Sequence, residues 1–146
     1  MAFHFALATV LRARETFERR EQMALDQCYR QLYSVQKQLS ETDGRLASLR
    51  SEYEACLAGG TKAATLRCLD EESLRVERRR LEVLKQLMQA QQVLRQQLES
   101  YHAARQKREV VSELRRSAYR EWTRKESQRE QRFADDLFLS RRSRRK

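Results

Sequence analysis

The sequence predicts an all-α protein made of one long antiparallel two-helix coiled-coil hairpin that spans residues 1–146. Three observations lead to this prediction. Proline is absent and only three glycines occur, so the many turns of a sheet protein have no residues to form them. Charged residues make up 36% of the chain, and glutamine, leucine and alanine are abundant, as is typical of long helices. Apolar residues also recur at alternating spacings of three and four on both sides of a single diglycine, which is the repeat of a coiled coil.

The first helix is predicted over about residues 3–58. Gly44 lies inside its apolar repeat, but the repeat keeps its phase across this residue, so we expect one continuous helix with a local cost of about 1 kcal/mol. The repeat consists of Leu25, Cys28, Leu32, Val35, Leu39, Thr42, Leu46, Leu49, Tyr53 and Cys56, with Phe3, Leu7, Val10, Phe17 and Ala24 upstream in a similar repeat displaced by one residue.

A turn is predicted over residues 58–61, in "CLAGGTKAATL". Glycine is the favoured residue just after a helix, and Thr61 can cap the helix that follows. The alternative is a flexible point within one longer helix.

The second helix is predicted over about residues 61–139, with a basic tail at 140–146. Beside its main apolar stripe runs a second apolar row. This row either belongs to a broader core face or forms a binding surface for another protein. The stripe comprises Leu66, Leu69, Ser73, Val76, Arg80, Val83, Leu87, Ala90, Leu94, Gln97 and Tyr101, and the second row comprises Leu74, Leu81, Leu84, Met88 and Leu98.

Pairing outward from the turn places residue i opposite roughly residue 119 − i. Phe3 and Phe5 then lie near residues 114–116, so the two chain ends share one end of the hairpin. After Tyr101 the apolar stripe thins, and we expect the end of the second helix to be frayed or ordered by a partner.

The charge is concentrated in the same region. The chain has a net charge of +10, and residues 105–146 hold fifteen basic and seven acidic side chains, a net +8. Such a segment indicates an acidic partner, which could be nucleic acid, anionic lipid or an acidic protein channel, or else a solvated helix with a basic tail.

The apolar opening segment could be an export signal, a membrane anchor or a docking tip. No basic region precedes its apolar run, and Arg12 and Arg14 cut that run short, unlike a signal peptide. No stretch approaches the roughly 18 apolar residues of a spanning helix. Docking is therefore favoured. The cysteines, at 28, 56 and 68, are expected to be reduced, although a disulfide across the turn between Cys56 and Cys68 is conceivable.

The sequence contains no pattern typical of an enzyme. His4 and His102 have no cysteine or carboxylate at ligand spacing, and "GGTK" at the turn lacks the strand and spacing of a phosphate-binding loop. We therefore expect no catalytic residue, no metal site, no cofactor and no small-molecule ligand.

The opening "FHFALATVLRARETFERRE" resembles the start of the flagellar FliJ family. "SEYEACL" before the turn and the basic–acidic close "REQRFADDLFLSRR" add to this resemblance. The family belongs to the flagellar type III export apparatus. The resemblance implies a non-enzymatic stalk in the cytoplasm, associated peripherally with the inner membrane. Its paired termini would enter the hexameric export ATPase FliI, and its hairpin would contact the export gate FlhA and export chaperones. An injection apparatus of the virulence type has stalks of the same kind.

The resemblance also implies two sets of contact residues. Those for the ATPase ring are Phe3, Phe5, Leu7, Val10, Leu11, Arg12, Arg14, Trp122, Arg124 and Arg129, and those for the export gate are Leu46, Leu49 and Tyr53.

Three other functions fit parts of the chain. A coiled coil that binds nucleic acid would use the arginine-rich end, but Tyr119, Trp122 and Phe133 are too scattered for a stacking platform, so we expect no nucleic-acid partner. Two hairpins could pair into a structural rod through the second apolar row. A helix on a membrane surface would need an apolar face opposite the arginines.

Overall fold

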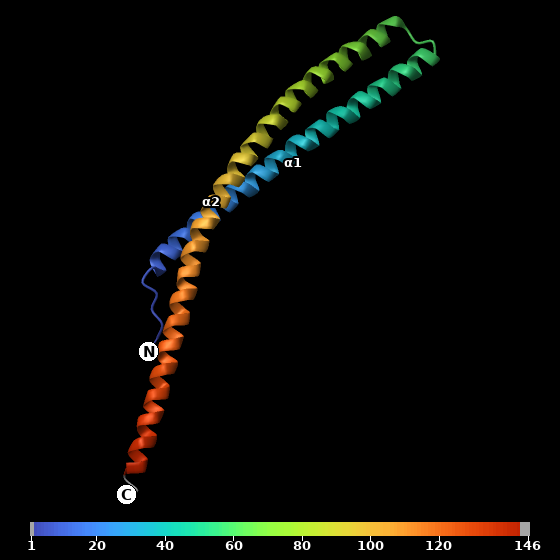
Figure 1. Cartoon of the computed structure of the whole chain (residues 1–146). Coiled ribbons are helices and arrows are strands. Elements are labelled where there is room, and N and C mark those ends of the chain that lie inside the picture. The colour runs from blue at the N-terminus through green and yellow to red at the C-terminus, as the bar shows by residue number, and fades with distance from the viewer. Residues whose placement is uncertain (1, 144–146) are drawn as a thin grey trace. The chain divides into compact units, whose positions relative to one another are not determined.

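The computed structural model describes residues 2–143 and contains two helices in that range (Figure 1). Helix α1 spans Ala8–Ala58 and helix α2 spans Ala63–Ser143. No strand occurs among the described residues, and the two helices pack against each other as a hairpin. The prediction of an all-α helical hairpin is confirmed.

Two compact units divide the chain. Unit 1 combines Met1–Arg20 with His102–Lys146, and unit 2 comprises Glu21–Tyr101. Each helix contributes one segment to unit 1 and another to unit 2, and both chain ends belong to unit 1. The turn between the helices belongs to unit 2.

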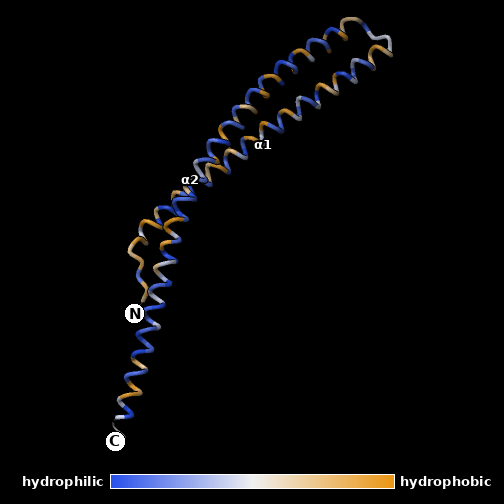
Figure 2. Tube along the Cα trace, viewed as in Figure 1, coloured by the Kyte–Doolittle hydropathy of each residue, from blue (hydrophilic) through white to orange (hydrophobic). Residues whose placement is uncertain are grey.

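The core of each unit is a narrow seam between two helices. Every position of the two predicted stripes, from Leu25 to Cys56 and from Leu66 to Tyr101, is buried or half-buried. Leu49 and Val83 are the most deeply buried side chains, with 1% and 0% exposure. The buried residues are Leu25, Val35, Leu49 and Val83 in unit 2 and Leu11, Ala104 and Val111 in unit 1. Figure 2 shows the apolar positions spaced along both helices among hydrophilic ones.

The second apolar row of α2 divides between core and surface. Leu84 and Leu98 are half-buried and widen the seam. Leu74, Leu81 and Met88 remain 54%, 59% and 69% exposed. A seam between only two helices has no third neighbour to cover these three side chains.

The diglycine ends α1 as predicted. Gly60 has a φ of +68°, the left-handed conformation that glycine adopts without a steric penalty. The amide of Thr61 donates to the carbonyl of Cys56 at 3.2 Å, which closes the end of α1. Because α2 begins at Ala63, Lys62 and not Thr61 directly precedes it, and the predicted cap by Thr61 is wrong. The thiols of Cys28, Cys56 and Cys68 are free, as expected.

Polar contacts across unit 2 follow the predicted register to within four residues. Arg80 Nε donates to Asp43 Oδ1 at 2.6 Å, and Arg45 Nε donates to Glu72 Oε1 at 3.0 Å. Gln97 Nε2 donates to the carboxylate and to the main-chain carbonyl of Glu21, at 2.6 and 3.1 Å. The last contact is notable because Gln97 is a stripe position at which polar groups would otherwise lie unpaired in the seam.

Both outer helix boundaries differ from those predicted. Helix α1 begins at Ala8 and not near residue 3; residues 2–5 are not helical, and residues 6–7 form a turn. Helix α2 continues to Ser143, four residues beyond the predicted end at residue 139. Residues 140–143 of the predicted basic tail are helical, and 144–146 lie outside the described range. Arg141 and Arg142 in the last turn favour this extension, because they complement the helix dipole.

Candidate functional site

The first residues of unit 1 leave the helical path and lie along α2 (Figure 1). Residues 2–7 are named the N-terminal strap here. The ring of Phe3 contacts Tyr119 edge-to-face, with centroids 5.2 Å apart and an interplanar angle of 83°. It also lies 5.9 Å from the ring of Trp122, and Tyr119 and Trp122 stack at 5.9 Å and 26°. These three rings form an aromatic cluster that holds the strap on α2.

The cluster lies farther along α2 than the predicted position at residues 114–116. The difference follows from the strap conformation. An extended residue advances about 3.3 Å, whereas a helical residue advances about 1.5 Å. Residues 3–7 lie outside α1, so Phe3 can reach several helical residues beyond the register expected for a helix. The expectation that Tyr119 and Trp122 are too scattered to form a platform is wrong for this pair, whose spacing of three places both rings on one helix face.

A shallow groove lies beside the aromatic cluster. It has a volume of about 420 Å³ and is lined by both apolar and charged side chains. Its lining residues are Phe3, Leu11, Glu15, Ser112, Arg115, Arg116 and Tyr119. A partner side chain that enters the groove would meet both aromatic surface and guanidinium groups.

A salt bridge between Glu18 and Arg108 joins the two helices of unit 1. Arg108 Nε donates to Glu18 Oε2 at 2.6 Å, and its second guanidinium nitrogen donates to Oε1 at 3.1 Å. The side chains are only 25% and 15% exposed. The hydrogen bond from Arg108 lowers the pKa of Glu18 despite opposing desolvation, and the same bond raises the pKa of Arg108. This bidentate pair fixes the start of α1 against α2.

Glu18→Gln is expected to lower the free energy of unfolding by about 1 kcal/mol at neutral pH. The corresponding fall in Tm is about 3 °C. Because the pKa of Glu18 is lower in the folded chain than in the unfolded chain, the pair contributes fully above the unfolded-state pKa of about 4.3. Its contribution is lost as the pH falls through the folded-state pKa. Thermal unfolding followed by circular dichroism between pH 7 and pH 3 should show the two proteins converging in acid.

Glu113→Gln is the matched control for this substitution. Glu113 pairs with Arg116 at 3.1 Å, but its side chain is 58% exposed, so solvent screens the pair. The control should unfold like the parent protein at every pH. An equal loss in both variants would mean that general charge balance, and not the bidentate pair, causes the effect.

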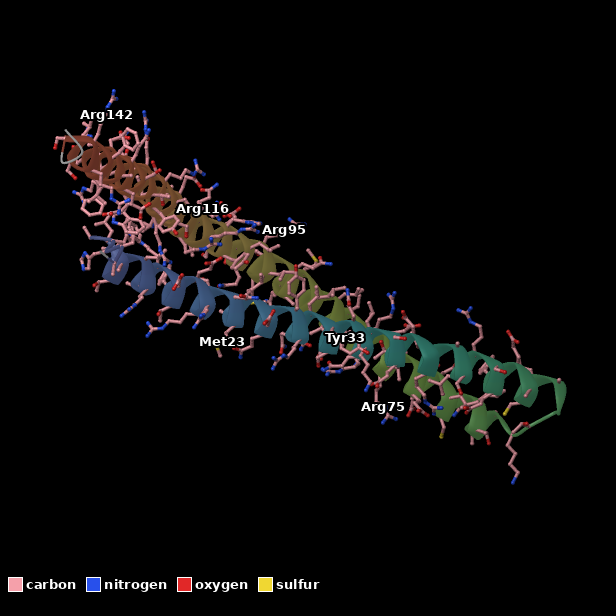
Figure 3. All side chains as sticks on the ribbon, turned by 90° about the horizontal axis from the view of Figure 1, so that it is seen from below. Met23, Tyr33, Arg75, Arg95, Arg116 and Arg142 are labelled. Carbon is pink, nitrogen blue, oxygen red and sulfur yellow. The ribbon has the colours of Figure 1, made fainter. Side chains whose placement is uncertain are left out.

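Beyond Trp122, the described part of α2 presents exposed basic and apolar side chains, most of which form no ion pair. Residues 127–143 are all exposed. Within the described range, no ion pair involves Arg124, Arg132, Arg141 or Arg142, while Arg129 pairs with Glu126 at 2.9 Å. Figure 3 shows Arg116 and Arg142 projecting from α2.

Sequence reasoning missed part of this surface. Phe133, Leu137, Phe138 and Leu139 are 43–66% exposed. The predicted apolar stripe includes Phe133 but not Leu137, Phe138 or Leu139. The consecutive "LFL" was the available signal, since a run of three apolar residues cannot all face one seam.

The residues predicted for the ATPase ring gather in unit 1. Leu7 and Val10 are 41% and 42% exposed. Leu11 is only 6% exposed. It therefore belongs to the core beneath the strap and has almost no surface for a partner to contact. Of the others, Arg12, Arg124 and Arg129 are exposed, and Phe3, Phe5, Arg14 and Trp122 are half-buried.

The residues predicted for the export gate lie in unit 2. Leu46 and Tyr53 are half-buried, and Leu49 is 1% exposed. All three are positions of the α1 stripe, which already indicated burial. Leu49 therefore has no surface for a partner, and any contact here would use Leu46 and Tyr53 at the edge of the seam.

The comparison with protein families decides the class of protein. The family model described as Flagellar FliJ protein matches residues 3–146. The chain belongs to the flagellar FliJ family. No curated protein and no solved structure gives a significant match. As a FliJ-family member, the chain is a flagellar export-related protein that associates with components of that export system. This assignment also favours a flagellar export system over an injection apparatus.

Two further features bear on how a FliJ-family chain can act. Neither helix, over residues 2–143, contains a segment long and apolar enough to cross a bilayer. The same residues contain no group of three or more histidine, cysteine or acidic side chains that could hold a metal ion. In unit 1 of this FliJ-family chain, the aromatic cluster, the groove, the exposed apolar side chains and the arginines without ion pairs among the described residues are available for binding.

Proposed function

We propose that this chain is a non-enzymatic central stalk of the flagellar type III export apparatus. In this proposal unit 1 enters the pore of the hexameric ATPase FliI and promotes its assembly and ATP turnover. The observation that carries the proposal is the gathering of both ends of the chain in unit 1, where Phe3 packs on Tyr119 and Trp122. A rod can enter a ring only if one of its ends offers contact surface.

The chemistry of unit 1 suits an apolar pore with acidic groups. Leu7 and Val10 supply exposed apolar area, and Arg12, Arg124 and Arg132 supply exposed positive charge. Opposite charges steer association and align the partners, while buried apolar area supplies most of the affinity. Past Trp122, α2 continues for 21 residues to Ser143, about 30 Å at 1.5 Å per residue, which is long enough to reach through the pore of a protein ring.

Contacts with the export gate FlhA and with export chaperones complete the proposal. The FliJ-family resemblance assigns the gate contact to the segment around Leu46 and Tyr53, in which Arg50 is exposed. Through these partners the stalk would reside in the cytoplasm, peripherally associated with the inner membrane.

The decisive experiment mixes the purified chain with its cognate FliI and measures ATP hydrolysis. Turnover is expected to rise with the ratio of stalk to ATPase until each hexamer holds one stalk. Raising the salt concentration should weaken the stimulation, because the arginines act partly through screened charge. Unchanged turnover at several ratios would contradict the proposal.

The basic surface of unit 1 requires one further measurement. If the arginines attract DNA phosphates only by non-specific electrostatics, binding to duplex DNA should disappear at about 0.15 M salt. Binding that persists there would favour a nucleic-acid-binding coiled coil instead.

A further inference from the structure

We propose that the N-terminal strap is a two-state element. In the free chain it is docked on α2 through Phe3, and when released it becomes a helical extension of α1. The role assigned to the released form rests on the proposed function, but the switch itself is a property of the free chain.

Nothing in the sequence requires α1 to begin at Ala8. Leu7 occupies the position before the first helical residue and cannot cap it, and the first turn contains no acidic residue. Both features are unfavourable for a helix start, because free amides there gain from a polar cap and from negative charge. The strap also has no proline or glycine, and Phe3, Leu7 and Val10 have the spacing of a helix face. Local preference therefore favours a helix that continues upstream.

Tertiary contact opposes this local preference. Phe3 meets Tyr119 at 5.2 Å and Trp122 at 5.9 Å, and it also lines the groove beside Leu11. The amide of Ala8 donates to the carbonyl of Phe5 at 3.1 Å, which forms the turn that leads the strap away from α1. The energies of an aromatic pair and of a missing helix cap are of the same order. Two conformations of similar free energy are the requirement for a switch.

The two conformations present different surfaces. With the strap docked, Phe3 covers part of the Tyr119–Trp122 pair. With the strap helical, Phe3, Leu7 and Val10 form one row on α1, and the Tyr119–Trp122 pair is uncovered. An apolar partner surface, such as the pore of the export ATPase, would bind the second form better and would shift the population toward it.

Trp122 is the only tryptophan in the chain, so its fluorescence reports on the strap directly. Phe3→Ala should shift the Trp122 emission to longer wavelength and increase its quenching by acrylamide. Nuclear magnetic resonance should then show helical carbon chemical shifts for residues 3–7, whereas the parent chain should show non-helical shifts for these residues. Tyr119→Ala should produce the same helical shifts without any change to the helix propensity of the strap itself.

Phe133→Ala is the matched control, because Phe133 is a 66% exposed phenylalanine on α2 outside the aromatic cluster. It should leave the Trp122 emission and the strap shifts unchanged. The proposal is overturned if Phe3→Ala leaves Trp122 as protected from acrylamide as in the parent chain. It is also overturned if residues 3–7 stay non-helical in Phe3→Ala or in Tyr119→Ala. Because these measurements use the free chain, a strap that switches while ATP turnover stays unstimulated would refute the stalk function alone.

Discussion

Leu49→Ala is expected to lower the free energy of unfolding by about 2–4 kcal/mol, the largest stability effect of any single truncation in this chain. Leu49 is 1% exposed, and its side chain lies in a seam only two helices wide. The substitution removes buried methyl groups and leaves a cavity that neighbouring side chains fill only in part. Urea denaturation followed by helical circular dichroism measures the loss as a lower midpoint.

Leu81→Ala provides the matched comparison. It makes the same chemical change in unit 2, but Leu81 is 59% exposed, so the free energy of unfolding should change by less than about 0.5 kcal/mol. Equal losses at the two positions would show that the seam does not bury Leu49 in solution. A smaller loss at Leu49 than at Leu81 would indicate that the second apolar row is covered, for instance by a second copy of the hairpin.

Simultaneous replacement of Phe3, Phe5 and Leu7 by alanine is expected to remove the stimulation of the export ATPase. Truncating an apolar anchor costs about 1–2 kcal/mol of binding free energy. Three such losses would weaken binding by a factor of about 100 or more. The helical hairpin should persist, because these residues precede α1 and only Phe3 and Phe5 are half-buried. ATP hydrolysis at a fixed ratio of stalk to FliI measures the effect, and circular dichroism verifies the fold.

Alanine at Leu74, Leu81 and Met88 is the corresponding control. These side chains are exposed and apolar like Leu7, but they lie in unit 2. The triple variant should stimulate the ATPase as the parent chain does. Equal loss of stimulation in both triple variants would argue against a contact made specifically by unit 1.

The periodic parts of the fold were predictable from the sequence. The stripe from Leu25 to Cys56 determines which face of α1 is buried, because a helix can turn only one side toward its partner. Gly60 was predictable as a helix end because glycine readily adopts the φ of +68° found there. Counting outward from the turn places Glu21 within one residue of Gln97 and Asp43 within four residues of Arg80.

The start of α1 was not predictable in the same way. Its repeat continues upstream to Phe3, and only contact with Tyr119 and Trp122, more than a hundred residues away, draws the strap off the helix. Local preferences cannot reveal a boundary that distant residues impose. At the candidate site, the gathering of both chain ends followed from the register, and the burial of Leu49 followed from its stripe position. The burial of Leu11 did not, because Leu11 lies outside the predicted repeat.

The polar side chains within the seam of unit 2 have a mechanical consequence. Sliding one helix by a heptad would keep stripe positions opposite stripe positions, but it would separate Gln97 from Glu21 and Arg80 from Asp43. Separating Gln97 from Glu21 would leave part-buried hydrogen-bonding groups without partners at the seam, which costs more than an apolar mismatch. The exposed Arg80–Asp43 pair adds little, because solvent screens it. The two helices of unit 2 are thus held in one longitudinal alignment, which opposes the sliding of one helix past the other.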